Sequence, residues 1–398
     1  MKMMGRLSLA AMILFAAAIQ AHADDIKIGV IGSFTGPYAD WGHRFQEGVD
    51  LYVAQHNALA GGHHVTIVYR DDGGNNPARA KQLAQELIVR DGVQYLAGLD
   101  FTPTVFAVAD VITEAKIPFV IFNSASSVVV RKSPYFLRTG FTQWEVGVPA
   151  AQYAAKMGAK RATIIVADYA PGLDSIDAIQ TAFVAAGGKI ADIIKAPLGT
   201  YDYSSYIQRV KDGAPDTLFT SNPGGPMSQS LVKTYVNSGL REKGVAYWAG
   251  GGETEEQNLP NIGDGGIGLY SARTYTYLLD TPLNHAFVTA IRDKFHEAHD
   301  FPNIATVEAY DGIALVFHMI AATDGKRDGD KAIASARGYQ WDSPRGPIEI
   351  DPKTRDLIQN VYILQVEKVG GALRNKVLFT YPAVKDQWKE LHPEGAHH

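Results

Sequence analysis

Short runs of β-branched and other apolar residues alternate with amphipathic segments in the first third of the chain. The helical segments carry apolar residues at intervals of three and four positions. One of them has its own start signal, because Asn76 can cap a helix and Pro77 can stand at its first position. Four strands are expected between these helices, at residues 26–31, 65–69, 95–99 and 118–122.

The same alternation restarts farther along the chain. No Pro- or Ser-rich linker and no short-period repeat separates the two halves. The pattern therefore predicts an α/β protein with two closely joined lobes, each a doubly wound parallel sheet with helices on both faces. Further strands are expected at residues 162–166, 190–194, 217–220, 245–248 and 269–275, and after two more helices at 347–350 and 361–366.

The first 23 residues differ from the rest. Lys2 and Arg6 precede an apolar run at residues 7–19, and residues 21–23 read Ala-His-Ala, the small-x-small pattern of a cleavage site. We expect residues 1–23 to be a signal peptide that is removed before Asp24, so that the mature chain is exported. The cysteine that a lipid anchor would need at the cleavage point is absent from the sequence.

Composition excludes several classes of function. The 398 residues include no cysteine, so a thiol nucleophile, a zinc–cysteine site and an iron–sulfur cluster are excluded. The chain has 37 basic and 42 acidic side chains, a formal charge of −5 that becomes about −7 without the signal peptide. Because no basic surplus is available to neutralise phosphates, nucleic acid is not an expected partner.

Enzyme signatures are weak. Residues 263–268 match the glycine pattern of a dinucleotide-binding loop, but a strand is expected where that loop needs a helix. His296 and His299 lie three residues apart, and spacing places no third metal ligand beside them. No nucleophile–base pair stands out. We therefore expect a protein without cofactor or metal, and an enzyme is the least favoured alternative.

Polar residues gather where two neighbouring strands end. Thr102 and Thr104 follow the strand at 95–99, and the Ser124–Ser127 segment follows the strand at 118–122. Open α/β sheets bind ligands at the carboxyl ends of their strands, where hydroxyls and free backbone amides can hold a small carboxylate. Each cluster taken alone is equally well explained by helix capping and turn formation.

Aromatic residues occupy the corresponding loops. A single aromatic residue is more often part of a core, but a repeat of one type of residue across several such loops indicates a lined cleft. The aromatic residues in question are Tyr38, Trp41, Phe101, Tyr169, Tyr275 and Tyr277.

An ordered set of motifs resembles a known family. Residues 28–37, which read IGVIGSFTGP and are followed by Trp41-Gly42, are similar to the opening of the periplasmic leucine/isoleucine/valine-binding proteins. These proteins are the solute receptors of branched-chain amino-acid ABC transporters. The likeness covers essentially the whole mature chain. It continues through residues 69–72, 117–119, 168–172, 308–312 and 345–347.

The resemblance implies a type I periplasmic-binding fold, in which two lobes joined by three crossovers close on a ligand by hinge bending. By alignment the crossovers fall near Phe141, Arg273 and Ile350. The protein would deliver its ligand to an inner-membrane ABC permease, and we expect a monomer. The first lobe would comprise residues 24–141 and 274–350, and the second residues 142–273 and 351–398.

The resemblance also carries the family's ligand contacts onto this chain. Trp41 falls where the family stacks an aromatic ring on the ligand, and Thr102 falls at its carboxylate-binding hydroxyl. Glu253 lies near the acidic residue that holds a ligand ammonium group. Closure would bring Tyr169 and Glu253 onto the ligand from the second lobe. The expected ligand-binding residues are Trp41, Phe101, Thr102, Ser124, Ala125, Ser126, Tyr169 and Glu253.

Three positions depart from the amino-acid-binding pattern. Pro171 and Gly224 stand where those proteins commonly present a tyrosine, and Ala305 stands where an aromatic residue closes the side-chain pocket. Residues 168–172 look closer to family members that take up benzoate and phenylpropenoid acids. We therefore expect an aromatic carboxylate as the ligand. A branched-chain or other hydrophobic amino acid is the alternative ligand, and a periplasmic ligand sensor is the less favoured role.

Overall fold

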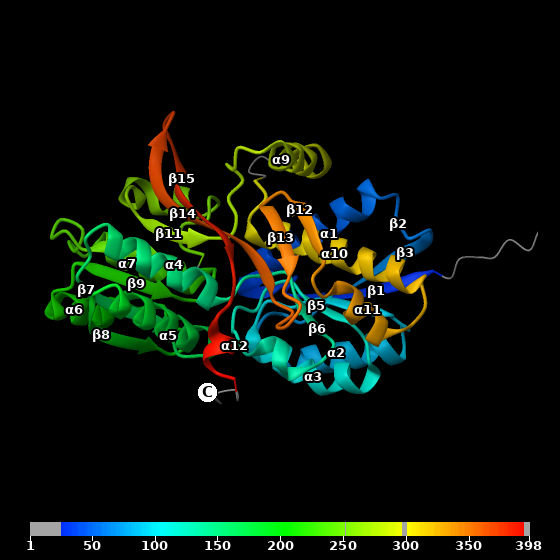
Figure 1. The fold of residues 1–398 in the computed structure, drawn as a ribbon. Helices are drawn as coiled ribbons and strands as arrows, with labels where there is room; N and C mark the ends of the chain where they lie inside the picture. The colour runs from blue at the N-terminus through cyan, green and yellow to red at the C-terminus, as the bar shows by residue number, and fades with distance from the viewer. Residues whose placement is uncertain (1–24, 251, 297–300, 394–398) are drawn as a thin grey trace, which may run out of the picture.

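The computed structural model describes residues 25–250, 252–296 and 301–393, which form two α/β lobes (Figure 1). The predicted signal peptide and His299 lie outside these residues.

The first lobe is built on a six-stranded sheet with the strand order β2-β3-β1-β4-β5-β6. All neighbours are parallel except β2, which pairs antiparallel with β3. The predicted strands of this region are confirmed to within two residues. The strands are β1 (Ile26–Gly32), β2 (Leu59–Ala60), β3 (His63–Asp71), β4 (Tyr95–Gly98), β5 (Phe119–Ile121) and β6 (Phe136–Arg138).

Helices cover both faces of this sheet (Figure 1). The predicted cap of α2 is confirmed, because the Asn76 side chain accepts a hydrogen bond from the Arg79 amide at 3.1 Å. The longest helix, α10, is apolar enough to span a membrane, but 78% of its most apolar window is buried, as in a core helix. The helices are α1 (Ala39–Gln55), α2 (Pro77–Val89), α3 (Thr102–Ala115), α9 (Pro282–Phe295), α10 (Ile304–Thr323) and α11 (Gly329–Ala336).

The second lobe has a larger, mixed sheet. Its parallel part runs in the order β8-β7-β9-β10-β11, and these five strands are the ones that the sequence pattern predicts for this region. The parallel strands are β7 (Arg161–Ala167), β8 (Lys189–Ala196), β9 (Thr217–Ser221), β10 (Ala246–Ala249) and β11 (Tyr270–Arg273). The helices here are α4 (Gln143–Lys156), α5 (Ala170–Ala185), α6 (Ser204–Gly213), α7 (Pro226–Val236) and α8 (Leu259–Ile262).

The C-terminal strands depart from the predicted pattern. β14 (Leu357–Val369) pairs antiparallel with β11 and with β15 (Ala372–Val384), while β12 (Gln340–Ser343) and β13 (Gly346–Ile350) extend the sheet antiparallel on the side of the first lobe. The sequence analysis ended the chain's strands at residue 366 and missed β15. This strand lies at an edge, and because its side chains are mostly half-exposed it carries neither a continuous apolar run nor a clean alternation.

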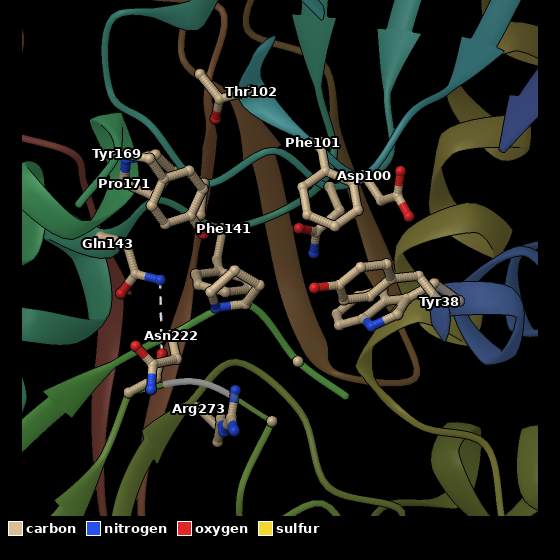
Figure 2. Close-up of a pocket in the computed structure, with 17 residues that line it drawn as sticks. Tyr38, Asp100, Phe101, Thr102, Phe141, Gln143, Tyr169, Pro171, Asn222 and Arg273 are labelled. Carbon is tan, nitrogen blue, oxygen red and sulfur yellow. Dashed lines mark hydrogen bonds between the residues drawn. The ribbon is translucent and has the colours of Figure 1, made fainter. Parts of the chain in front are cut away.

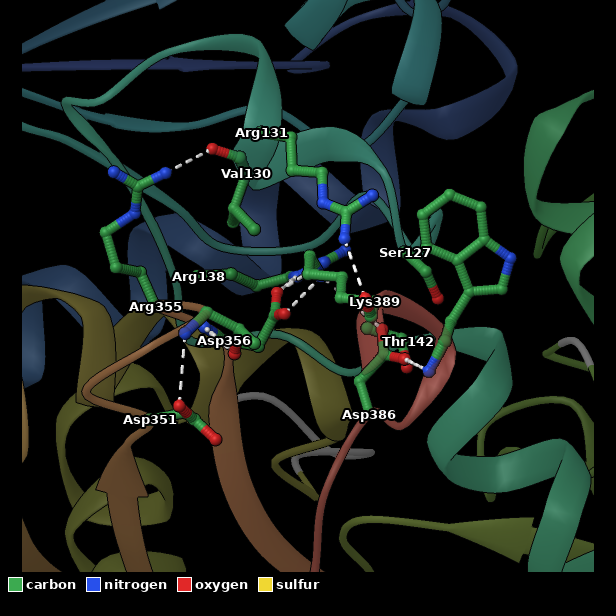
Figure 3. Close-up of polar contacts among 12 residues, drawn as sticks. Ser127, Val130, Arg131, Arg138, Thr142, Asp351, Arg355, Asp356, Asp386 and Lys389 are labelled. Atoms are coloured by element: carbon green, nitrogen blue, oxygen red, sulfur yellow. Dashed lines mark hydrogen bonds and ion pairs between the residues drawn. The ribbon is translucent and has the colours of Figure 1, made fainter. Parts of the chain in front are cut away.

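The chain passes between the lobes three times, after β6, after β11 and between β13 and β14, as the resemblance implies. A buried charge cluster ties the first and third passages together (Figure 3). Arg138, at the end of β6, is fully buried, and its Nε donates to Asp356 Oδ1 at 3.0 Å. Its Nη1 donates to the backbone oxygens of Ser124 and Ser126, both at 2.7 Å.

The C-terminal segment completes this cluster. Lys389, in α12 (Trp388–Leu391), pairs with the second carboxylate oxygen of Asp356. Arg131 donates to the backbone oxygens of Lys389 and His392 at 2.8 and 2.7 Å. Burial pushes the pKa of Asp356 up, but Lys389 and Arg138 together outweigh it and hold this pKa below its ordinary value. The carboxylate of Asp356 is thus the shared counter-charge of two buried cations.

Removing that counter-charge should be costly. In Asp356→Asn the buried Arg138 loses its ion-pair partner and Lys389 keeps only Asp386, at 3.6 Å, so we expect the free energy of unfolding to fall by about 3–5 kcal/mol. Denaturant titration followed by circular dichroism measures this loss. Asp192→Asn is the matched control. Asp192 pairs with Arg209, and their side chains are 24% and 56% exposed, respectively. Because the pair is open to solvent, it should contribute no more than about 1 kcal/mol. Equal losses in the two variants would contradict the structural role of the buried cluster.

Candidate functional site

A pocket lies between the two lobes, where the carboxyl ends of parallel strands from both sheets meet (Figure 2). The empty space between its walls is about 530 Å³, including space that is open to solvent. The strands β4, β5, β7, β9, β10 and β11 all deliver residues to it.

Aromatic rings form much of the wall. Phe101 from the first lobe and Tyr169 from the second lie on opposite sides of the cavity (Figure 2). The Tyr38 ring meets Phe101 edge-on, with ring centroids 4.7 Å apart, and its hydroxyl points into the cavity. Phe141, on the first passage between the lobes, also lines the pocket. Such walls favour a flat, apolar ligand body.

The first lobe adds hydroxyls at the start of α3. Thr102 is buried, and its Oγ1 lies 3.0 Å from Ser124 Oγ, either of which can be the donor. Ser124 has a φ of +81°, which an ordinary L residue rarely adopts. This conformation is held by Asn123, whose Oδ1 accepts from the Ser124 amide at 2.8 Å, and by Arg138 on the Ser124 carbonyl.

A pair of carboxyls lies behind the first-lobe wall. Ser33 Oγ lies 2.8 Å from Asp100 Oδ2 and 3.1 Å from Asp72 Oδ1. The Ser33 hydroxyl has one proton and donates it to one of these two carboxyls at a time. Burial raises the pKa of both carboxyls, and the charge of Asp72 raises that of Asp100 further. Asp100 lines the pocket, but its carboxyl points away from the cavity (Figure 2).

The second lobe contributes buried polar groups with unused hydrogen-bonding capacity. Arg273, at the end of β11, is 5% exposed, and its Nη1 lies 3.6 Å from Glu255 Oε1. Arg273 Nη2 is buried and has no hydrogen-bond partner in the part of the chain that the structure describes. The same holds for Oδ1 of Asn222, a side chain that is 3% exposed. Burial raises the pKa of Glu255 to about 7, against the opposing effect of Arg273.

The two lobes touch beside the pocket. A Cβ atom at Gly224 would lie 2.9 Å from Trp41 Nε1, and one at Gly225 would lie 3.4 Å from the Tyr38 ring. The resemblance aligns Gly224 with a tyrosine of the amino-acid-binding pattern, and here the Trp41 indole lies against this position. The pocket is therefore closed on this side by a contact that only a residue without a side chain permits.

Five of the eight residues expected to bind ligand line the pocket. These are Trp41, Phe101, Thr102, Ala125 and Tyr169. Ser124, Ser126 and Glu253 lie behind its wall. Ser126 Oγ donates to Asp174 at 2.8 Å, and the fully buried Glu253 accepts from Thr220 at 2.9 Å and from Tyr247 at 3.3 Å. Whether any of the eight contacts a ligand stays a prediction.

Other expected positions lie away from the pocket. Ala305 is in the apolar core of the first lobe, and Tyr275 and Tyr277 pack in the core cluster that includes α4 and α9. No group of three or more His, Asp or Glu side chains among the described residues could hold a metal ion.

The sequence analysis missed the polar residues of the second lobe that line the pocket. Arg273 served there only to mark a crossover, and Asn222 was not singled out. Both follow the rule that identified Thr102, because Arg273 ends β11 and Asn222 comes directly after β9. The signal was therefore present, but a single arginine or asparagine at a strand end forms no motif.

Comparison with known sequences identifies the family. The sequence model of the family described as periplasmic binding protein matches residues 25–372. A Leu/Ile/Val-binding protein homologue from Brucella melitensis is 40% identical over 380 residues, which cover 95% of this chain and 97% of the relative.

Two solved structures are similar over almost their whole length. A solute-binding protein of an ABC transporter from Rhodopseudomonas palustris HaA2, in complex with p-hydroxybenzoic acid, is 46% identical, with a TM-score of 0.89 over 91% of this chain and 98% of that one. One from Rhodopseudomonas palustris BisB5, in complex with 3,4-dihydroxybenzoic acid, is 37% identical, with a TM-score of 0.86 over 92% and 99%. The family resemblance carried by the sequence motifs is thus confirmed, and this chain belongs to the periplasmic binding protein family.

Proposed function

We propose that this protein is the solute-binding protein of an ABC transporter and captures a small aromatic carboxylate between its lobes for import. The observation that carries the proposal is a pocket with aromatic walls from both lobes and a buried cation, Arg273, at one end. Two relatives that are 46% and 37% identical hold hydroxybenzoic acids. That chemistry matches the wall of this pocket.

Capture follows from the placement of the lining residues. The proposed lobes are residues 24–141 with 274–350 and residues 142–273 with 351–398. Trp41, Phe101, Thr102 and Ala125 meet the ligand from the first lobe, and Tyr169 meets it from the second. Closing the lobes removes both faces of an aromatic ring from water, which favours the closed form by roughly 25 cal/mol per Å² of apolar surface. The closed form is the one that docks on an inner-membrane permease.

The protein reaches this permease as an exported, periplasmic chain. Residues 1–23 direct export and are removed before Asp24. Neither capture nor release needs a cofactor. A hydrophobic amino acid remains the second candidate ligand, because a Leu/Ile/Val-binding homologue is 40% identical to this chain.

A panel of ligands tests the proposed class. Residues 24–398 are stripped of carried-over ligand by partial unfolding and dialysis, and the thermal midpoint is measured with 4-hydroxybenzoate, 3,4-dihydroxybenzoate, benzoate, cinnamate and leucine. A ligand at about 100 times its dissociation constant adds roughly 2.7 kcal/mol, which raises the midpoint by several degrees. We expect this shift with the hydroxybenzoates and none with leucine. A shift with leucine alone would replace the proposed ligand by an amino acid.

Glu253→Gln separates the two ligand classes at a single residue. Glu253 is bonded to Thr220 and Tyr247 behind the wall, and Gln keeps an oxygen that can accept from both. The affinity for 4-hydroxybenzoate, measured by titration calorimetry, should stay within about threefold of the unmodified protein. An amino-acid ligand would instead lose an ion pair with its ammonium group, at a cost of about 3–5 kcal/mol. A comparable loss for 4-hydroxybenzoate would mean that Glu253 faces the ligand after all.

A further inference from the structure

The pocket has two polar ends with different electrostatics. Thr102 and Arg273 lie at opposite ends of the cavity (Figure 2). The family resemblance assigns the ligand carboxylate to the Thr102 end. The two ends differ in charge and in the hydrogen-bond donors that they leave for a carboxylate.

The Thr102 end offers an anion hydroxyls and the amino-terminal end of α3, but no positive charge from a side chain. Thr102 Oγ1 is already engaged with Ser124 Oγ at 3.0 Å. No cationic side chain from the described part of the first lobe lines the pocket. Asp100 and Asp72 lie behind this wall and share Ser33 Oγ, so any ionised member of the pair repels a carboxylate here.

The Arg273 end offers a carboxylate both a positive charge and an unused hydrogen-bond donor. Among the described lining residues Arg273 carries the positive charge, and it is 5% exposed. Its Nη2 is buried without a hydrogen-bond partner in the described chain, which is a costly state for a guanidinium. A carboxylate on Nη2 would supply both the missing acceptor and a counter-charge in a geometry that favours arginine.

Glu255 shares this guanidinium without satisfying it. Glu255 Oε1 lies 3.6 Å from Arg273 Nη1, beyond normal hydrogen-bond length, and its side chain is itself buried. It partly neutralises Arg273 in the empty pocket and competes with a ligand carboxylate. Replacing Glu255 by Gln would therefore leave more of the positive charge for the ligand.

We infer that Arg273 is the specificity-determining residue that selects an anionic ligand, its guanidinium binding the carboxylate while the ring extends toward Thr102 and Tyr38. This assignment rests on the proposed function and names the group that reads the acid. It reverses the orientation that the family resemblance implies.

The test compares an acid with its neutral isostere. Titration calorimetry at pH 7.5 measures the dissociation constants of 4-hydroxybenzoate and 4-hydroxybenzamide, which differ in charge but hardly in shape. The unmodified protein should prefer the acid by at least about 30-fold, the lower range for one partner of a buried charge pair. In Arg273→Met the acid should lose that factor while the amide changes by less than about threefold, so the preference disappears.

Three further variants complete the test, and the first of them guards against loss of folding. Arg273→Met combined with Glu255→Gln also removes the buried carboxylate that pairs with Arg273, and it should show the same lost preference if the single variant unfolds. Thr102→Val is the matched control at the other end. It removes one hydroxyl, and it should weaken the acid and the amide by similar factors. Glu255→Gln alone should tighten binding of the acid and leave the amide unchanged.

The outcomes separate the two proposals. A preference for the acid that persists without Arg273, or one that disappears in Thr102→Val, overturns the assignment to Arg273 while the proposed function stands. Failure of the unmodified protein to bind either compound, or any aromatic acid of the panel, overturns the proposed function and this assignment together.

Discussion

Arg138 is buried completely at the end of the first lobe's sheet, and burial obliges each of its donors to find an acceptor. It finds them in the carbonyls of Ser124 and Ser126 and in the carboxylate of Asp356, which in turn pairs with Lys389. One guanidinium thus fixes the loop behind the pocket wall, a passage between the lobes and the C-terminal helix. The position of Thr102, which contacts Ser124, depends on the same interaction.

A second guanidinium shows the opposite condition. Arg273 is as deeply buried as a structural arginine, yet it has a donor without a partner, and Asn222 nearby has an unused acceptor. Unsatisfied buried groups are costly, and in the wall of a pocket a ligand can supply the missing partner. Arg138 and Arg273 therefore differ in one property. The donors of Arg138 are all bonded within the protein, whereas Arg273 Nη2 has no partner in the described chain. The aromatic walls between the two lobes define the shape of that ligand.

The sequence predicted the parallel strands and their helices well, because strands buried on both faces carry continuous apolar runs that leave a strong signal. It did not predict the short strands β2, β6 and β12, which have two to four residues each, or β15, a half-exposed edge strand. At the site, the hydroxyl residues at strand ends and the aromatic residues in the loops correctly indicated which residues line the first-lobe wall. Arg273 and Asn222 were missed, because single polar residues make no pattern and their lack of a partner is a property of packing. Asp311 and Arg345, which belong to the family motifs, instead form a buried ion pair whose guanidinium also donates to the Thr139 carbonyl.

The most direct measurement is a crystal structure of the stripped mature protein soaked or co-crystallised with 4-hydroxybenzoate. The ring should lie between Phe101 and Tyr169, with both lobes in contact with it. A carboxylate oxygen should lie within hydrogen-bond distance, about 2.7–2.9 Å, of an Arg273 nitrogen. An empty pocket in the presence of saturating ligand, or ligand bound only outside the space between the lobes, would contradict capture between the lobes.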